Sequence, residues 1–359
     1  MVEIRRHRWF RGRFPWQGVV FLLCLIVIAG ASMWFGALFF RASGVQSAEI
    51  PQVQVRRALD GVWVEPEEQS YLPVGVMIEN MIDSRPASGI ARAQLVVEAP
   101  VEAGITRFLA VYAVRDVGSE IGPVRSLRPY YLAWAKEIGA ALVHVGGSPE
   151  AMARVRKEYA RLNVDQFYEA GSFWRTKARQ APHNVYTTLP LIRELLTNRS
   201  IGDTSTFPQW VFEDDPPLAA RPEGADHLSL SFSTDPYRVV WEYDRATNAY
   251  RRFHGSVPHA DVDGGVVLAK NIIVIPTRVQ ILDAIGRRAI TLLGSGKAIL
   301  FRNGLRMDAR WVKEKPDDRL TLVSVDGAPI PLTAGTTWIE VFPMTGAMVY
   351  NDVKEVLNK

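Results

Sequence analysis

The feature that most constrains this chain is an apolar run near its start, 18-GVVFLLCLIVIAGASMWFGALFF-40, which contains no charged residue. As a helix the run would be about 34 Å long at roughly 1.5 Å per residue, and the hydrocarbon core of a bilayer is about 30 Å thick. The apolar core of a cleaved signal peptide is shorter, at roughly 7–15 residues. The sequence therefore predicts an uncleaved transmembrane helix over residues 18–40.

Basic residues are concentrated before this run. The tail 1–17 holds five arginines and one glutamate, whereas Arg41 is the only basic residue close behind the run. The positive-inside rule therefore predicts a cytoplasmic N-terminus and places the remaining ~320 residues outside. We expect a single-pass protein of the plasma membrane, with most of its mass extracytoplasmic.

Charge and cysteine content exclude other classes of protein. Outside the tail, basic and acidic residues balance, whereas a nucleic-acid-binding domain normally carries a basic face. We therefore expect no nucleic-acid partner. The only cysteine, Cys24, lies inside the apolar run between leucines, a context that argues against lipid attachment. The part beyond the run has no cysteine, so its stability must come from its hydrophobic cores.

The segment after the apolar run begins with a predicted stalk and an α/β domain. Residues 41–70 are polar and show no apolar periodicity. In residues 71–205, apolar strands such as 105-ITRFLAVYAV-114 alternate with helical patterns over 129–140 and 148–163. Strands that alternate with helices are typical of an α/β domain.

The C-terminal part has a different pattern. Residues 206–228 are rich in proline and predict a linker. Residues 229–345 consist almost entirely of alternating strand patterns, which predict an antiparallel all-β domain. Residues 346–359 are a tail. The expected fold is thus an α/β domain plus an antiparallel all-β domain behind one transmembrane helix.

The stretch 141-ALVHVGGSPEAM-152 joins a predicted strand to a predicted helix. Ser148 is a favoured N-cap, Pro149 a favoured first residue, and Glu150 suits the positive end of the helix dipole. The first amides of a helix lack internal partners and can bind an anion. The alternative is a plain strand-to-helix turn with a capped helix.

Arginines cluster along the same domain, several of them next to predicted strand ends. In open α/β sheets ligands bind where strands end, and the guanidinium group pairs with phosphate or carboxylate oxygens. The alternative is that these arginines pair with Glu79, Asp83, Glu98 or Glu102. The candidate ligand-binding residues are Arg85, Arg107, Arg125, Ser126, Arg128, His144, Gly146, Gly147, Ser148, His183 and Asn184.

The histidines give no catalytic or metal motif. His254 and His259 lie with Asp261 and Asp263 in a polar loop without a paired-histidine helix or a cysteine. Ser148 lies near His144 in the sequence, but no G-x-S-x-G elbow surrounds it. We therefore predict no catalytic residue, no metal and no cofactor.

Several segments resemble the YerB-like lipoproteins of bacteria, a family with two domains of unknown function. They occur in the family's order: 74-VGVMIEN-80, 98-EAPVEAGITRFLAVY-112, 121-IGPVRSLRPYYLAWA-135, 144-HVGGSPEA-151, 181-APHNVYT-187 and, later, AKNIIVI, FRNGLRMDARW and LTAGTTWIEVF. The resemblance covers roughly residues 71–343. This chain departs from the family in having an apolar span where members are often lipid-anchored, and Gln94 where many have an acid.

The chain is also similar in outline to the LytR–CpsA–Psr phosphotransferases, which move polymers from lipid pyrophosphates to the cell wall. The shared features include 83-DSR-85 and 163-NVDQFY-168. The resemblance implies arginines that clamp a pyrophosphate and acids that hold a divalent metal. Here Arg125-Ser126 stands where that family has Arg-Asp, which argues against catalysis.

We therefore expect a membrane-anchored envelope protein that binds an anionic, phosphate-bearing ligand, either lipid-linked or part of a wall polymer. Two alternatives remain. One is a phosphotransferase that needs a divalent metal, and the other is a non-enzymatic scaffold whose arginines form salt bridges.

Overall fold

The computed structural model describes residues 20, 26–37, 53–223, 227–291, 293–355 and 357. The chain divides into two units, Met1–Gln52 and Val53–Lys359. In the first unit, residues 26–37 are helical. Among the described residues, no helix is both long enough and apolar enough to cross a membrane. The predicted span 18–40 lies partly outside the described residues, and the predicted tail 1–17 lies wholly outside them.

The centre of the second unit is a mixed ten-stranded sheet. In spatial order its strands are β21 (Thr321–Val323), β20 (Leu305–Lys313), β19 (Gly294–Arg302), β16 (Asn271–Thr277), β23 (Thr337–Pro343), β4 (Leu95–Pro100), β5 (Thr106–Tyr112), β3 (Val74–Glu79), β6 (Ala141–His144) and β7 (Asn163–Asp165). The four strands before β23 come from the C-terminal half of the chain and the five after it from the N-terminal half. The sheet therefore joins the two halves.

The second sheet is antiparallel and has seven strands, all from the C-terminal half. They are β14 (Val257–Pro258), β13 (Ala249–His254), β12 (Arg238–Asp244), β11 (His227–Ser231), β24 (Ala347–Tyr350) and β25 (Val353–Lys354), with β15 (Leu268–Ala269) also paired to β13. Four strand pairs stand apart: β1 (Val55–Arg56) with β2 (Trp63–Val64), β8 (Trp174–Arg175) with β9 (Val185–Tyr186), β10 (Phe212–Glu213) with β22 (Leu332–Thr333), and β17 (Val279–Ile281) with β18 (Arg288–Ile290).

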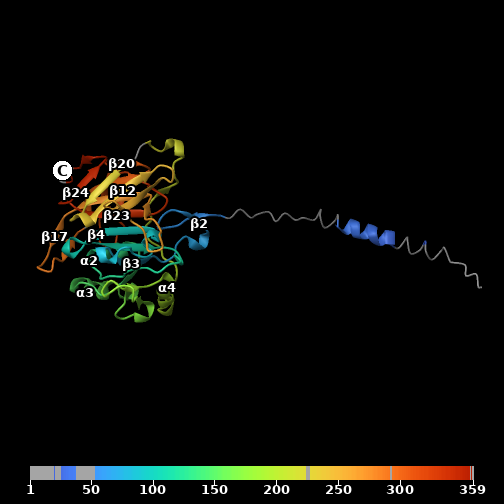
Figure 1. Cartoon of the computed structure of the whole chain (residues 1–359), viewed down its shortest axis with the longest axis horizontal. Helices are drawn as coiled ribbons and strands as arrows, with labels where there is room; N and C mark the ends of the chain where they lie inside the picture. The colour runs from blue at the N-terminus through green and yellow to red at the C-terminus, as the bar shows by residue number, and fades with distance from the viewer. Residues whose placement is uncertain are drawn as a thin grey trace, which may run out of the picture. The chain divides into compact units, whose positions relative to one another are not determined.

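Three helices belong to the N-terminal half: α2 (Pro129–Glu137), α3 (Pro149–Glu158) and α4 (Leu189–Asn198). Figure 1 shows them in the cyan-to-green part of the chain that also contains β3 and β4, as the α/β prediction expected. Each carries proline within its first two positions, where the missing N–H costs no helical hydrogen bond. The hydroxyls of Ser148 and Thr188 accept hydrogen bonds from the third backbone N–H of α3 and α4, which confirms the predicted cap.

Two hydrophobic clusters cover opposite faces of the ten-stranded sheet. Alternation along the strands sends Val96, Ile272 and Trp338 to the face that packs on the seven-stranded sheet. The residues next to them, such as Val97 and Ile339, face the cluster that contains α2. Because both faces are covered, the central strands are apolar throughout.

The C-terminal half is not purely antiparallel, contrary to the prediction. Strand β23 pairs in parallel with β16 on one side and with β4 on the other, and Figure 1 shows β23 beside β4 in the middle of the unit. All seven residues of β23 are buried, as is usual for parallel strands covered on both faces. The pairing partners are far apart in the sequence, so periodicity alone could not reveal their direction.

Three segments outside the two predicted domains are also packed. In the predicted stalk 41–70, Leu59 is buried and β1 pairs with β2. In the predicted linker 206–228, Trp210 is buried and donates a hydrogen bond to the carbonyl of Leu320. In the predicted tail 346–359, β24 extends the seven-stranded sheet. Part of this packing is with distant parts of the chain, since Trp210 contacts Leu320 and β24 pairs with β11.

Candidate functional site

Most of the predicted ligand residues meet where β3 ends. Glu79, the last residue of β3, lies opposite Arg107 of β5. The Glu79 carboxylate forms an ion pair with Arg125, whose Nε lies 2.8 Å away, and accepts a hydrogen bond from His183 at 2.6 Å. Glu79 is 3% exposed and Arg125 20%. We call Arg107, Arg125 and Arg128 the arginine corner.

The other two arginines of the corner are also engaged. Arg128 makes a two-pronged contact with the Glu102 carboxylate, at 2.6 and 2.7 Å. The Arg107 guanidinium is buried and donates to the carbonyl of Ser126 at 2.7 Å. Burial, with a smaller effect from the neighbouring Arg128, lowers the pKa of Arg107 to about 10. Arg107 is therefore a cation inside the protein with no described carboxylate bonded to it.

The predicted helix start lies beside the corner, because Leu127 hydrogen-bonds to Gly146 and Ser148. The Gly146 N–H donates to Asp165 at 2.8 Å. Gly146 has a φ of 55°, and a Cβ there would lie 2.9 Å from the Phe167 ring, so the turn requires glycine.

The polar groups of this turn are satisfied mainly by the protein. The Ser148 hydroxyl caps α3. The two ring nitrogens of buried His144 lie 2.8 and 2.6 Å from Gly146 O and Asn163 Oδ1. Asn184 accepts from Arg175. The structure thus brings the predicted residues together, with the exception of Arg85, and much of their hydrogen-bonding capacity is used inside the protein.

Arg85 lies elsewhere, in a cavity of about 630 Å³ that both halves of the chain line. Ile82, Arg85 and Pro86 come from the N-terminal half. The remaining lining residues belong to the C-terminal half: Asp235, Pro236, Arg238 and the segment from His254 to Asp261. We call this space the junction cavity. Its volume is within the usual range for small-molecule sites.

Arg85 is held by neutral groups. Its guanidinium donates to the backbone carbonyl and the side-chain oxygen of Asn80 and to the carbonyl of Pro236, and it lies 5.2 Å from the centre of the Tyr237 ring. No described carboxylate lies within ion-pair distance. Burial, and next the nearby charge of Arg252, lower the pKa of Arg85 to about 10, so it remains a cation at neutral pH.

A buried charged network lies behind the cavity. Arg252, fully buried, donates to Glu98 at 2.5 Å and to Nδ1 of His259 at 2.7 Å. Its guanidinium lies 4.8 Å from the centre of the Trp338 ring. Thr106 donates to Glu98 at 2.5 Å. Glu98 thus neutralises Arg252 and leaves Arg85 without a negative partner.

A second carboxyl group adjoins this pair. Glu340 lies opposite Glu98 across the β23–β4 pairing, and Trp241 donates to it at 3.0 Å. Burial, and next the negative charge of Glu98, raise the pKa of Glu340 well above its usual range. Both effects favour the protonated, neutral form of Glu340. With Glu98 paired to Arg252 and Glu340 protonated, the site avoids burying two negative charges together.

Three titratable groups of the lining segment from His254 to Asp261 also have shifted pKa values. Burial lowers the pKa of His254 and of His259, so both imidazoles are neutral at neutral pH. Burial raises the pKa of Asp261 to about 6, although its carboxylate accepts backbone N–H groups of Ile90 and Ala91. Shifted pKa values in a cavity are typical of functional sites.

This network was not among the predictions from the sequence, although the sequence contains a signal for it. In the hairpin of β12 and β13, Trp241 lies opposite Arg252, and Tyr250 shares a strand face with Arg252 through alternation. An arginine on a face with tryptophan and tyrosine is buried, and a buried arginine requires an acid. The position of that acid, Glu98, depends on pairing between the two halves.

Among the described residues, no group of three or more His, Cys, Asp or Glu side chains is arranged to hold a metal ion. The loop residues His254 and His259 instead pack against each other, with ring centres 4.2 Å apart. Asp263 forms an exposed ion pair with Arg92.

Comparison with known proteins identifies the family. The N-terminal domain of DUF3048, a protein family of unknown function, matches residues 59–202, and the C-terminal domain of that family matches residues 228–339. The first match begins within the predicted stalk. The YerB protein of Bacillus subtilis (strain 168), provisionally named a lipoprotein, is 28% identical over 308 residues, which are 85% of this chain and 92% of YerB.

The fold is shared as well. The crystal structure of YerB from Bacillus subtilis superposes with a TM-score of 0.73 at 28% identity and covers 82% of this chain and 99% of the YerB chain. The two family domains, their order and the fold agree with the resemblance detected in the sequence. This chain therefore belongs to the YerB-like family, whose members are built from the two DUF3048 domains.

Proposed function

We propose that this protein is a membrane-tethered extracytoplasmic protein that binds a phosphate-bearing ligand of the cell envelope in the junction cavity. The apolar run 18–40 and the basic tail before it support the tether and its direction. The lipoprotein name of the Bacillus relative agrees with an envelope location, although that name implies a lipid anchor in place of an apolar span.

The observation that carries the binding proposal is the state of Arg85. It lines the cavity as a cation, and its described hydrogen-bond acceptors are uncharged. In the corner, by contrast, Arg125 and Arg128 are bonded to carboxylates. An anion in the junction cavity would gain a charge-assisted hydrogen bond without displacing an internal acid.

We propose that the protein binds this ligand without chemically converting it. The described residues offer no ready metal cage, and the cavity histidines are held neutral by burial. A phosphotransferase remains the alternative, because the weaker family resemblance includes Arg85. A scaffold role is the other alternative, and the ion pairs of the arginine corner favour it.

Calorimetric titration of the full-length protein in zwitterionic nanodiscs with inorganic pyrophosphate, and then with undecaprenyl phosphate, tests the proposal. We expect binding that weakens as salt rises and that falls at least tenfold in Arg85→Ala. Turnover of a pyrophosphate lipid that requires Mg²⁺ would support the phosphotransferase. Equal binding by Arg85→Ala and the native protein would refute the junction cavity as the site.

A further inference from the structure

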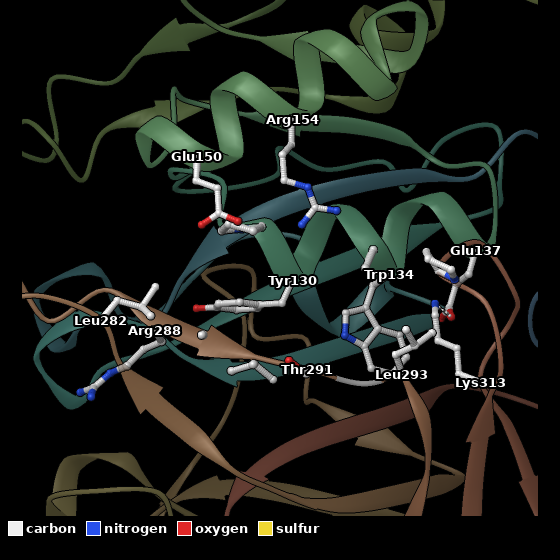
Figure 2. Close-up of a pocket in the computed structure, with 15 residues that line it drawn as sticks. Tyr130, Trp134, Glu137, Glu150, Arg154, Leu282, Arg288, Thr291, Leu293 and Lys313 are labelled. Carbon is white, nitrogen blue, oxygen red and sulfur yellow. Dashed lines mark hydrogen bonds and ion pairs between the residues drawn. The ribbon is translucent and has the colours of Figure 1, made fainter.

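The structure contains a second cavity, of about 310 Å³. It shares no lining residue with the junction cavity. Figure 2 shows its parts: Tyr130 and Trp134 project from α2, Glu150 and Arg154 from α3, and Leu282, Thr291 and Leu293 from the β17–β18 hairpin and the segment after it. We call this space the hairpin groove. None of the predicted ligand residues lines it.

The walls of the groove are aromatic and aliphatic. Trp134 and Tyr130 are mostly buried, and the Tyr130 hydroxyl donates to the carbonyl of Pro100 at 2.7 Å, which fixes its ring. Leu282 and Leu293 are 50% and 48% exposed. A rigid aromatic floor beneath exposed leucines is the usual composition of a site for an apolar group.

Charged groups on the rim are balanced. Lys313 and Glu137 form a buried ion pair at 2.8 Å, and Arg154 pairs with Glu158. Glu150 is exposed at the start of α3, and Arg288 donates to the carbonyl of Val101. The rim therefore has no excess of positive charge that would select a phosphate.

Strand β18 borders the groove and is unpaired along its outer edge. The lining includes four consecutive residues from Arg288 to Thr291. The β17–β18 sheet has only two strands among the described residues. The N–H of Leu282 donates to the carbonyl of Arg287, and Arg288 pairs with Ile281 and Ile290 with Val279.

The direction of the free backbone groups follows from this register. In an antiparallel ladder, residues that exchange hydrogen bonds alternate with residues whose N–H and C=O groups point away from the partner. Since residues 282 and 287 are a bonded pair, Arg288 and Ile290 turn their backbone groups outward. An exposed edge of this kind is a template for another strand.

We propose that the hairpin groove binds an extended peptide segment of a partner protein, which pairs with β18 as a third strand and places an apolar side chain over Trp134. A lipid chain would fill the apolar walls, but it would leave the outward N–H and C=O groups of Arg288 and Ile290 without partners. A peptide backbone satisfies them, and alternate side chains then face the aromatic floor.

The test uses full-length protein in zwitterionic nanodiscs. A linear heptapeptide phage library is panned on loaded discs after depletion on empty discs, and the recovered peptides are made with a fluorescent label for anisotropy. Each is also made in two forms with N-methyl groups on alternate residues. We expect one methylated form to lose at least tenfold in affinity and the other to stay within twofold, because only alternate N–H groups face β18.

Thr291→Trp fills the groove from an exposed position and should weaken binding at least tenfold. Thr321→Trp, on the exposed edge strand β21, is the matched control and should leave binding unchanged, as should Arg85→Ala. Three results would overturn the proposal. These are an equal loss of affinity in both methylated forms, full binding by Thr291→Trp, and recovery only of peptides that also bind empty discs. Dimerisation abolished by Thr291→Trp would instead identify a second copy of this chain as the occupant and also overturn it.

Discussion

The arginine corner and the junction cavity both contain arginines from the same stretch of sequence, yet their chemistry differs. In the corner, Glu79 and Glu102 neutralise Arg125 and Arg128. In the cavity, Arg85 is bonded to carbonyl oxygens and one amide oxygen. Arginine clustering alone therefore does not identify an anion site. What matters is which arginine lacks a carboxylate and also lines a cavity: Arg107 has no described carboxylate but is buried, whereas Arg85 lines the junction cavity.

The difference has a structural cause. The corner is built within the N-terminal half, and its acids lie on strands and turns next to the arginines. The cavity forms where the two halves meet, and both halves contribute lining residues. There Glu98 is bonded to Arg252 of the C-terminal half. A local acid that could have paired with Arg85 is thereby engaged elsewhere.

The largest expected effect concerns the buried pair behind the cavity. Glu98→Gln removes the carboxylate that pairs with the buried Arg252 and should lower the free energy of unfolding by about 3–5 kcal/mol. Glu340→Gln replaces a neutral acid by a neutral amide of similar shape and should cost less than about 1 kcal/mol. Denaturant unfolding of the two variants measures this contrast. Similar losses in both would show that Glu340 is charged.

A second prediction concerns the pH dependence of Asp261. Its pKa is raised to about 6 in the folded protein, from an ordinary value of 3.8. The folded protein therefore favours the protonated form of Asp261. The stability that Asp261 contributes is complete below about pH 4 and is lost as the pH rises through 6, where the buried carboxyl group ionises. The stability of the native protein relative to Asp261→Ala should fall by roughly 2–3 kcal/mol between pH 4 and pH 7. Denaturant unfolding across this range measures it, and a constant difference would place the pKa at its ordinary value.

The smallest expected effect concerns the start of α3. Ser148→Ala removes the cap and should destabilise the protein by about 1 kcal/mol, measured by thermal unfolding. Ser148→Asp retains a capping oxygen and should recover most of that loss. If Ser148 also bound an anion in the corner, Ser148→Ala would weaken pyrophosphate binding as well as stability. We expect unchanged binding.

Local structure in this chain follows closely from the sequence. Proline and the serine cap predicted the start of α3, and the apolar pattern predicted strands such as β5. These elements depend on neighbours within a few residues. The parallel pairing of β23 with β4, and the hydrogen bond from Trp210 to Leu320, depend on partners more than a hundred residues away.

The candidate site was only partly predictable for the same reason. Sequence proximity offered Glu79, Asp83, Glu98 and Glu102 equally as partners for the arginines. The fold pairs Glu79 with Arg125 and Glu102 with Arg128 but commits Glu98 to Arg252. Arg85 was among the predicted ligand residues, whereas the histidines that line the junction cavity with it were not. Their place depends on how the two halves join.

The most direct test of the central claim compares the pyrophosphate dissociation constants of Arg85→Ala and Arg125→Ala, in full-length protein at one ionic strength. Both variants remove one positive charge, but only Arg85 lacks an acidic partner. We predict at least tenfold weaker binding for Arg85→Ala and less than a twofold change for Arg125→Ala. The reverse order would place the ligand in the arginine corner and contradict this account.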